Sequence, residues 1–233
     1  MFSHSRSHLV FQPRESWAPM FIRDVKPDFR FFSHSYLGDK SKEFAFESDH
    51  HVDLNPTSGY GHTLVQLCKF VTEHLQDVEM ITIANGDVVY KFSEVNAMFH
   101  YADRLSLNWF QPALSRDSYH SHKFTLVRPG RLSHPADYFC ECIFFTVPRS
   151  IIEFIAKSEL MTESGFGMDC YLIPYAFEKI KPKGVNIPMV IDLCPVGHLK
   201  PLGPHGTKVY ASGLTAMEEL VQMQHTIARL RNP

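Results

Sequence analysis

The chain has 233 residues, of which 44% are hydrophobic and 21% are charged, and its formal net charge is −2. This composition fits a globular protein with a sizeable core, and the charge excludes a uniformly basic nucleic-acid binder. Five cysteines without framework spacing indicate free thiols, and no apolar stretch approaches the roughly 18 residues of a membrane span. Because no signal peptide begins the chain either, we expect a soluble, intracellular protein of the reducing cytoplasm with no membrane contact.

The first part of the chain predicts short strands followed by a helix. Runs of apolar and aromatic residues indicate strands over 9–11, 21–22, 29–37 and 43–47. Apolar residues at spacings of three and four then predict a helix over 60–76. Two further strands, 78–83 and 88–92, flank Asn85-Gly86, which is typical of a type I′ turn, so we expect a β-hairpin there.

The second part predicts alternating helices and longer strands. The helices are expected over 93–105 and 150–161, and the strands over 122–127, 138–147, 168–173 and 185–193. Repeated Pro and Gly residues over 194–206 predict a loop through which no regular element runs. A strand over 207–211 follows, and Thr215 and Glu218 form a capping box that begins the last helix.

The order of these elements indicates the fold class, because strands cluster instead of alternating singly with helices. We expect an α+β fold with mainly antiparallel sheet and about four helices packed on it. Residues 1–193 are predicted to form this single domain, 194–206 a Pro/Gly-rich loop, and 207–233 a C-terminal strand and helix packed on the same domain or on a partner. A heptad-like seam within 213–231 also allows a homo-oligomer.

Sequence motifs exclude several enzyme classes. The chain contains no glycine-rich phosphate loop, no nucleophile elbow and no zinc-protease helix motif. His50, His51 and Asp53 are the densest group of potential metal ligands, and on an extended segment His51 and Asp53 share a face, with His62 as the nearest further ligand. The same cluster of residues is equally expected in a solvated loop before a helix, so we assign no metal ligand and no cofactor.

The segment 116–131 concentrates cations and aromatic rings, with Asp117 as its single acid. On a strand over 122–127, alternate side chains would form one face, where bases stack on rings while cations hold phosphate. The alternative is that Phe124 and Leu126 are core residues and the cations only solvate loops. The candidate nucleic-acid contacts are Arg116, Tyr119, His120, His122, Lys123, Arg128 and Arg131.

No motif identifies a family, but the predicted order of two four-strand groups, each followed by a helix, is similar to that of the plant Whirly single-strand-binding proteins. Our leading hypothesis is therefore a non-catalytic protein that binds single-stranded nucleic acid, RNA in preference to DNA, through a basic and aromatic sheet surface. One alternative is a metal-assisted hydrolase that uses His50, His51 and Asp53. Another is an assembly or scaffold protein that associates through its C-terminal helix.

Overall fold

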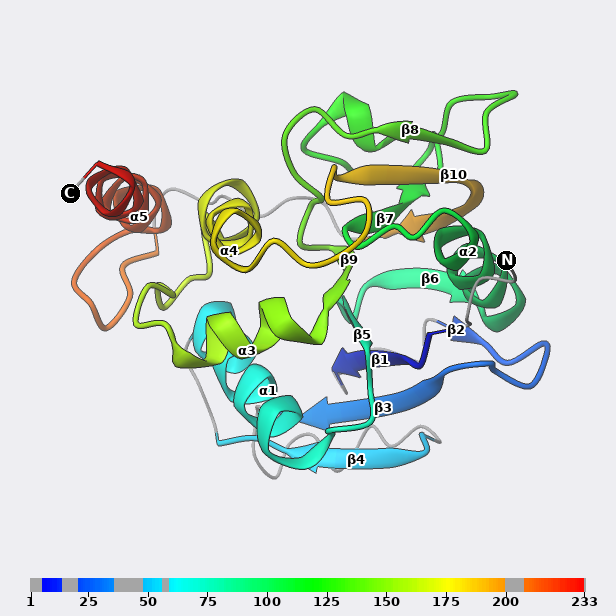
Figure 1. Ribbon diagram of the computed structural model, residues 1–233, viewed down its shortest axis with the longest axis horizontal. Coiled ribbons are helices and arrows are strands. Elements are labelled where there is room, and N and C mark those ends of the chain that lie inside the picture. The colour runs from blue at the N-terminus through cyan, green and yellow to red at the C-terminus, as the bar shows by residue number, and fades with distance from the viewer. Residues whose placement is uncertain (1–5, 14–20, 36–47, 56–58, 200–207, 233) are drawn as a thin grey trace.

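The computed structural model describes residues 6–13, 21–35, 48–55, 59–199 and 208–232 (Figure 1). Within these residues the strands are β1 (His8–Pro13), β2 (Phe21–Ile22), β3 (Arg30–Ser35), β4 (His50–Asp53), β5 (Met80–Ala84), β6 (Val88–Lys91), β7 (Phe110–Leu114), β8 (Ser133–Pro135), β9 (Phe144–Pro148) and β10 (Met189–His198). The α-helices are α1 (Tyr60–His74), α2 (Phe92–Arg104), α3 (Arg149–Lys157), α4 (Ile173–Ile180) and α5 (Ala216–Arg231). Among the residues so described, no helix is both long and apolar enough to cross a bilayer.

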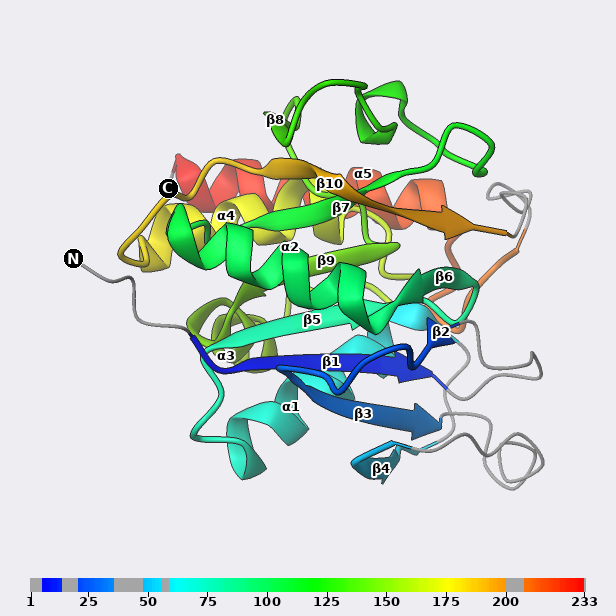
Figure 2. The same ribbon diagram turned by 90° about the vertical axis from the view of Figure 1, so that its right-hand side faces the viewer.

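The strands form one curled sheet in the order β2-β6-β10-β7-β9-β5-β1-β3-β4, with β8 added alongside β10. Strands β1, β3, β4 and β5 are joined by parallel pairings, as are β7 and β10, whereas β9 is antiparallel to both β5 and β7. Helix α2 covers one face of the sheet, and α1, α3 and α4 cover the other, with α5 outside α4 (Figures 1 and 2). The sheet is therefore mixed and mostly parallel.

The prediction of an α+β fold with mainly antiparallel sheet is wrong, and β5 shows why. Strands β5 and β6 exist, but they do not pair with each other: β5 lies between β1 and β9, and β6 lies between β2 and β10. All five residues of β5 are buried, so both of its edges and both of its faces are covered by other elements. The Asn85-Gly86 turn therefore leads from one part of the sheet to another instead of closing a hairpin.

Three other predicted strands differ from the structure. Residues 122–127 contain a 3₁₀ turn, Lys123–Thr125, and 138–147 form a strand only over β9. Residues 168–173 are helical, because the π-helical turn Met168–Leu172 runs into α4 and buries Met168 and Leu172 on one side. The predicted loop after residue 193 is wrong at its start, since β10 continues to His198 through an irregularity that accommodates Pro195.

Several local predictions are confirmed. Helices occur at α1, α2 and α3 close to the predicted ranges, and Thr215 and Glu218 form the predicted capping box at the start of α5. Met223 and Ile227 of α5 are buried in the core of the same chain, and Arg231 forms an ion pair with Glu178 of α4. The predicted strand over 43–47 and residues 200–206 of the predicted loop lie outside the described residues.

Candidate functional site

The parallel strands bring several chain segments to one edge of the sheet. Strand β1 pairs with β3 on one side and with β5 on the other, so the strand order reverses at the carboxyl end of β1. Three chain segments lie at this edge (Figure 2). They are the turn 85–87 after β5, the segment 115–122 after β7, and residues 141–143 before β9. Open α/β sheets bind their ligands at such a reversal, outside the carboxyl ends of the strands.

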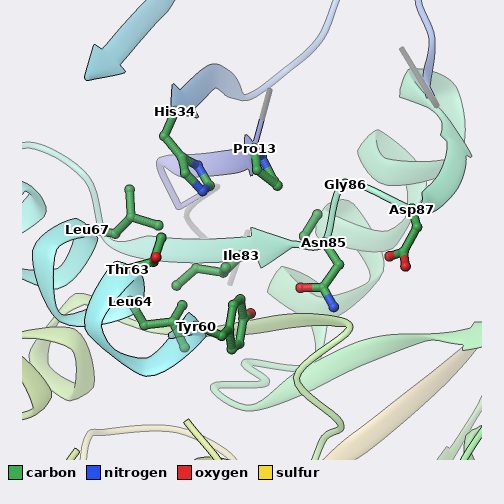
Figure 3. Close-up of a pocket in the computed structure, with 11 residues that line it drawn as sticks. Pro13, His34, Tyr60, Thr63, Leu64, Leu67, Ile83, Asn85, Gly86 and Asp87 are labelled. Atoms are coloured by element: carbon green, nitrogen blue, oxygen red, sulfur yellow. The ribbon is translucent and has the colours of Figure 1, made fainter. Parts of the chain in front are cut away.

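A cavity of about 140 Å³ lies at this edge (Figure 3). Its walls come from β1, β3, β5, the first turns of α1 and the turn after β5, through Pro13, His34, Tyr60, Thr63, Leu64, Leu67, Ile83, Ala84, Asn85, Gly86 and Asp87. Burial lowers the pKa of His34 to about 3, with a smaller contribution from His51, so this ring is neutral. The cavity is small, apolar on one side and polar at the turn, which suits part of a larger ligand.

Asp87 lies at the end of the turn, and within the described part of the chain one of its two carboxylate oxygens lacks the hydrogen bond expected of a buried polar atom. Its Oδ1 is buried and has no hydrogen-bond partner among the described residues. Its Oδ2 lies 3.4 Å from Nε2 of His198, at the end of β10. A buried carboxylate oxygen without a partner is costly in a folded protein, and it points to a ligand that completes it.

A hydrogen bond from the second ring nitrogen of His198, Nδ1, fixes the orientation of its imidazole ring. Nδ1 lies 2.8 Å from the backbone carbonyl of Tyr119, and because a carbonyl only accepts, Nδ1 carries the proton. Burial opposes protonation of the ring, but the hydrogen bonds to Asp87 and to the Tyr119 carbonyl outweigh it and raise the pKa of His198. His198 therefore presents Nε2 to Asp87, at the edge of the sheet.

Two carboxyl groups with raised pKa values lie near this pair. Burial raises the pKa of Glu141, against an opposing hydrogen bond from Ser121, and Glu141 Oε2 has no partner in the described part of the chain. Burial also raises the pKa of Asp169, whose Oδ1 accepts a hydrogen bond from the Cys170 amide at 2.8 Å. The charge of Asp169 adds to the raised pKa of Glu141, and His122 partly opposes the raised pKa of both carboxyls, so the three groups form one electrostatic cluster. Carboxyls with raised pKa are suited to proton transfer near neutral pH.

The predicted nucleic-acid contacts lie on the segment that leaves β7, but not on a strand. Arg116, Tyr119, Lys123, Arg128 and Arg131 are exposed, whereas His120 and His122 are half-buried. The His122 ring packs on Phe124, with ring centroids 5.3 Å apart, and Phe124 is a core residue as the alternative interpretation held. No structural observation tests whether these residues contact a ligand, so their assignment stays a prediction.

His51 and Asp53, the candidate metal ligands that the sequence analysis left unassigned, do share a face of β4. Asp53 Oδ1 lies 3.2 Å from His51 Nε2, and the hydroxyls of Ser33 and Ser35 on β3 hydrogen-bond to His51 Nδ1 and Asp53 Oδ1 at 2.7 Å each. These contacts tie β4 to β3. Within the described ranges, no group of three or more His, Cys, Asp or Glu side chains could hold a metal ion.

Sequence reasoning missed Asp87, Glu141, Asp169 and His198. Asp87 follows a fully buried strand, and polar residues at the end of such a strand mark the binding edge of a parallel sheet. The sequence did not indicate this edge, because Asn85-Gly86 is also typical of a hairpin turn and was interpreted as one. Glu141 is the only charged residue in the apolar run 138–145, which was the available signal for its role.

The comparisons with known proteins concern the fold. No protein-family model matches the sequence, and no curated protein is similar to it in sequence. The fold is similar to residues 1–349 of S. aureus TarS in complex with UDP-GlcNAc, with a TM-score of 0.62 and 10% identity over 95% of this chain and 65% of that one. It is also similar to GalNAc-T7 with UDP, GalNAc and Mn²⁺, with a TM-score of 0.59 and 9% identity over 94% of this chain and 48% of that one. The chain thus spans less than two thirds of either protein's length.

These similarities define an alpha/beta fold of the GT-A, Rossmann-like type found in glycosyltransferases. They overturn the hypothesis of a non-catalytic, single-strand-binding protein and the resemblance to the Whirly proteins, which rested on an antiparallel element order. The hydrolase and scaffold alternatives are overturned by the same finding. At about 10% identity the similarity establishes the fold alone.

Proposed function

We propose that this protein is a glycosyltransferase that moves a sugar from a nucleotide-sugar donor to an acceptor hydroxyl. The observation that carries the proposal is the buried, unpartnered Oδ1 of Asp87, at the edge where the strand order reverses. Two proteins of the same fold are recorded with nucleotide ligands, UDP-GlcNAc in one and UDP with GalNAc and Mn²⁺ in the other. In this chain the donor would occupy the cavity and extend past Asp87.

Asp87 and His198 are the residues that would hold a divalent cation in this site. Asp87 would offer Oδ1, and His198, whose Nδ1 is engaged by the Tyr119 carbonyl, would offer Nε2 once this nitrogen has lost its proton. Such ions commonly take one or two protein ligands and complete their coordination with phosphate oxygens and water. When bound, the cation would neutralise negative charge on the leaving diphosphate.

Glu141 and Asp169 supply the proton chemistry of the proposed reaction. Transfer breaks the bond between the anomeric carbon and the donor phosphate oxygen, forms a bond from that carbon to the acceptor oxygen, and releases the acceptor hydroxyl proton. A carboxylate of raised pKa takes up this proton more readily than an ordinary one. The neighbouring thiols Cys142 and Cys170 have pKa values raised by burial, so they stay protonated and are not competing bases.

Isothermal titration with UDP-GlcNAc, UDP-GalNAc and GDP-mannose, in Mn²⁺ and in EDTA, tests the proposal. We expect one of these donors to bind in Mn²⁺, and Asp87→Asn to weaken that binding at least about tenfold, or roughly 1.4 kcal/mol. Asp117→Asn is the matched control, because Asp117 is an exposed acid on the segment that leaves β7 at the same edge. The proposal fails if no donor binds, or if both variants lose the same affinity.

A further inference from the structure

The basic segment 116–131 borders the candidate site directly. The amide of Tyr119 donates to the backbone carbonyl of His198 at 3.1 Å, and His198 Nδ1 returns a hydrogen bond to the Tyr119 carbonyl. Two residues further on, the Ser121 side chain hydrogen-bonds to Glu141. The segment therefore connects the Asp87–His198 pair to the carboxyl cluster and continues outward from both.

The outer part of the segment is anchored to the sheet without using its cationic side chains. The buried His134 ring joins Asp192 of β10 to the Phe124 carbonyl, with contacts of 2.7 Å on each ring nitrogen. Asp192 also accepts a hydrogen bond from the backbone amide of Arg128 at 2.7 Å. The guanidinium group of Arg128 is thus left for another partner, on a segment whose backbone is already ordered.

The cations of this segment differ from the four arginines that form ion pairs within the described part of the chain. Arg6, Arg30, Arg149 and Arg231 each form an ion pair with a carboxylate. By contrast, Arg116, Lys123, Arg128 and Arg131 are exposed and form no ion pair with any described residue. Four exposed, unpaired cations in sixteen residues, against the single acid Asp117, give this segment a local excess of positive charge.

Exposed aromatic rings accompany these cations. Tyr119 is 49% exposed and Tyr138 is 82% exposed. Tyr138 precedes Phe139, whose ring contacts His122 and Phe124, so its chain position is beside the segment. Flat rings with a polar hydroxyl suit a ligand that has both apolar faces and hydroxyl groups, as a sugar does.

From this arrangement we infer that the acceptor is an anionic glycan, which carries phosphate or carboxylate groups and is held by residues 116–131. The inference rests on the proposed transferase function and specifies its acceptor. The donor diphosphate has its own partners at Asp87 and His198, so the unpaired cations are available to a second substrate. The guanidinium group of an arginine can donate two parallel hydrogen bonds to a phosphate or to a carboxylate, so the arginines of this segment suit either anionic group.

Fluorescence anisotropy with four labelled probes of similar length tests this inference. The probes are a neutral maltooligosaccharide, its phosphorylated form, an oligogalacturonide and a single-stranded oligonucleotide. We expect the phosphorylated or the uronate probe to bind more tightly than the neutral one, with an affinity that falls as salt rises. The preferred anionic group is identified by which of these two probes binds better.

Reversing the charge of three cations tests whether the anionic probe binds at residues 116–131. The triple variant Lys123→Glu, Arg128→Glu and Arg131→Glu should weaken the anionic probe roughly ten- to one hundredfold and leave donor affinity unchanged. The matched control is Lys179→Glu, Lys181→Glu and Lys183→Glu, which makes the same charge change at exposed residues in the last turn of α4 and just after it. Circular dichroism and thermal melting check that both variants fold.

The outcomes separate this inference from the proposed function. If the wild-type protein binds a donor but prefers neither anionic glycan to the neutral one, the acceptor inference is wrong and the transferase proposal stands. It is also wrong if the oligonucleotide binds as tightly as the anionic glycans, if the two triple variants behave alike, or if the first one loses donor binding. If no donor binds, the transferase proposal fails first.

Discussion

The carboxylate of Asp87 and the imidazole of His198, 3.4 Å apart, connect the turn after β5 to the end of β10. The Leu199 amide strengthens this connection, since it donates to the Asp87 carbonyl at 3.1 Å. The two strands lie on opposite sides of β7 and β9 in the sheet order. Asp87 directly precedes β6, and Val88 of β6 is the register partner of His198 in the antiparallel pairing with β10, so this pairing holds the turn after β5 against the end of β10.

Two substitutions of His198 should separate the roles of its ring nitrogens. His198→Gln places an amide near the position of Nε2, whereas His198→Asn places one near Nδ1 and removes the group that faces Asp87. We expect the Asn variant to weaken donor binding in Mn²⁺ roughly tenfold and the Gln variant to weaken it less. Titration calorimetry with the donor found for the wild-type protein measures this, and the reverse ranking would contradict the assigned geometry.

Glu141→Gln should raise stability at neutral pH and remove activity. Burial raises the pKa of Glu141, so its ionised form is penalised in the folded protein. The penalty is absent below the unfolded pKa of about 4.3 and grows as pH rises through the folded value. Thermal melting should therefore show the variant to be more stable at pH 8 and equal to wild type near pH 3.5. An unchanged stability difference across this range would mean that Glu141 is not held in a penalised, ionised state.

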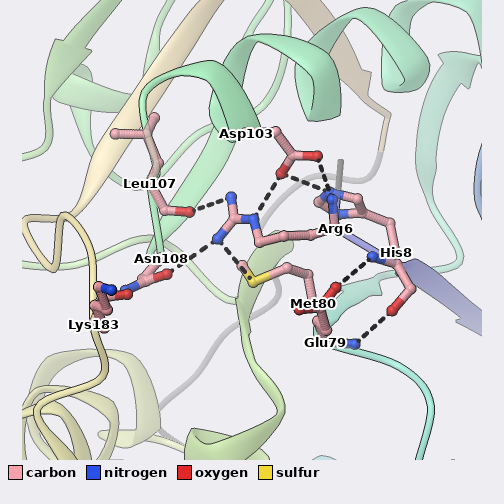
Figure 4. Close-up of polar contacts among 9 residues, drawn as sticks. Arg6, His8, Glu79, Met80, Asp103, Leu107, Asn108 and Lys183 are labelled. Carbon is pink, nitrogen blue, oxygen red and sulfur yellow. Dashed lines mark hydrogen bonds and ion pairs between the residues drawn. The ribbon is translucent and has the colours of Figure 1, made fainter. Parts of the chain in front are cut away.

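Arg6 and Asp103 form a buried ion pair that should be important for stability (Figure 4). Arg6 Nε lies 2.7 Å from Asp103 Oδ1, and the same guanidinium donates to the Leu107 carbonyl and to Asn108 Oδ1. Asp103→Ala leaves the partly buried Arg6 cation without its carboxylate and removes the partner of the buried His8 ring, and breaking such a pair typically costs about 3–5 kcal/mol. Urea unfolding measures the loss.

The pair between Arg30 and Asp77 is the control for that measurement. Its N–O distance is similar, 2.9 Å, but the Asp77 side chain is 77% exposed. Asp77→Ala should therefore cost no more than about 1 kcal/mol. Equal losses in the two alanine variants would show that the Arg6 network is not a buried one in solution.

Gly61→Ala should disturb the cavity wall at the start of α1. A methyl group at this position would lie 2.0 Å from the backbone carbonyl oxygen of Thr162. We expect a loss of roughly 1–3 kcal/mol together with weaker donor binding, because Tyr60 and Thr63 line the cavity. Gly197→Ala is the control, since its methyl group would make only ordinary contacts, the nearest at 3.5 Å. If both variants melt at the same temperature as wild type, α1 does not pack as described.

The helices were predictable because each one carries its signal within a few turns of sequence. The apolar stripe of α1 and the capping box of Thr215 and Glu218 are local patterns, and both occur as expected. The strands were predictable as extended segments but not as partners. Nothing near Asn85-Gly86 distinguishes a hairpin turn from a turn between β5 and β6 in separate parts of the sheet, since β5 is paired by β1 and β9 from distant sequence.

Part of the candidate site could likewise be predicted from the sequence, and part of it could not. The exposed cations of 116–131 could be recognised from composition, because charge density is a local property. The convergence of Asp87, Glu141, Asp169 and His198 could not, since these residues lie on four separate segments that meet only through pairing and packing between distant parts of the chain. Local periodicity is enough to form a helix or a strand, but the free energy that selects strand partners comes from burial and hydrogen bonds between distant segments, and that selection places the site.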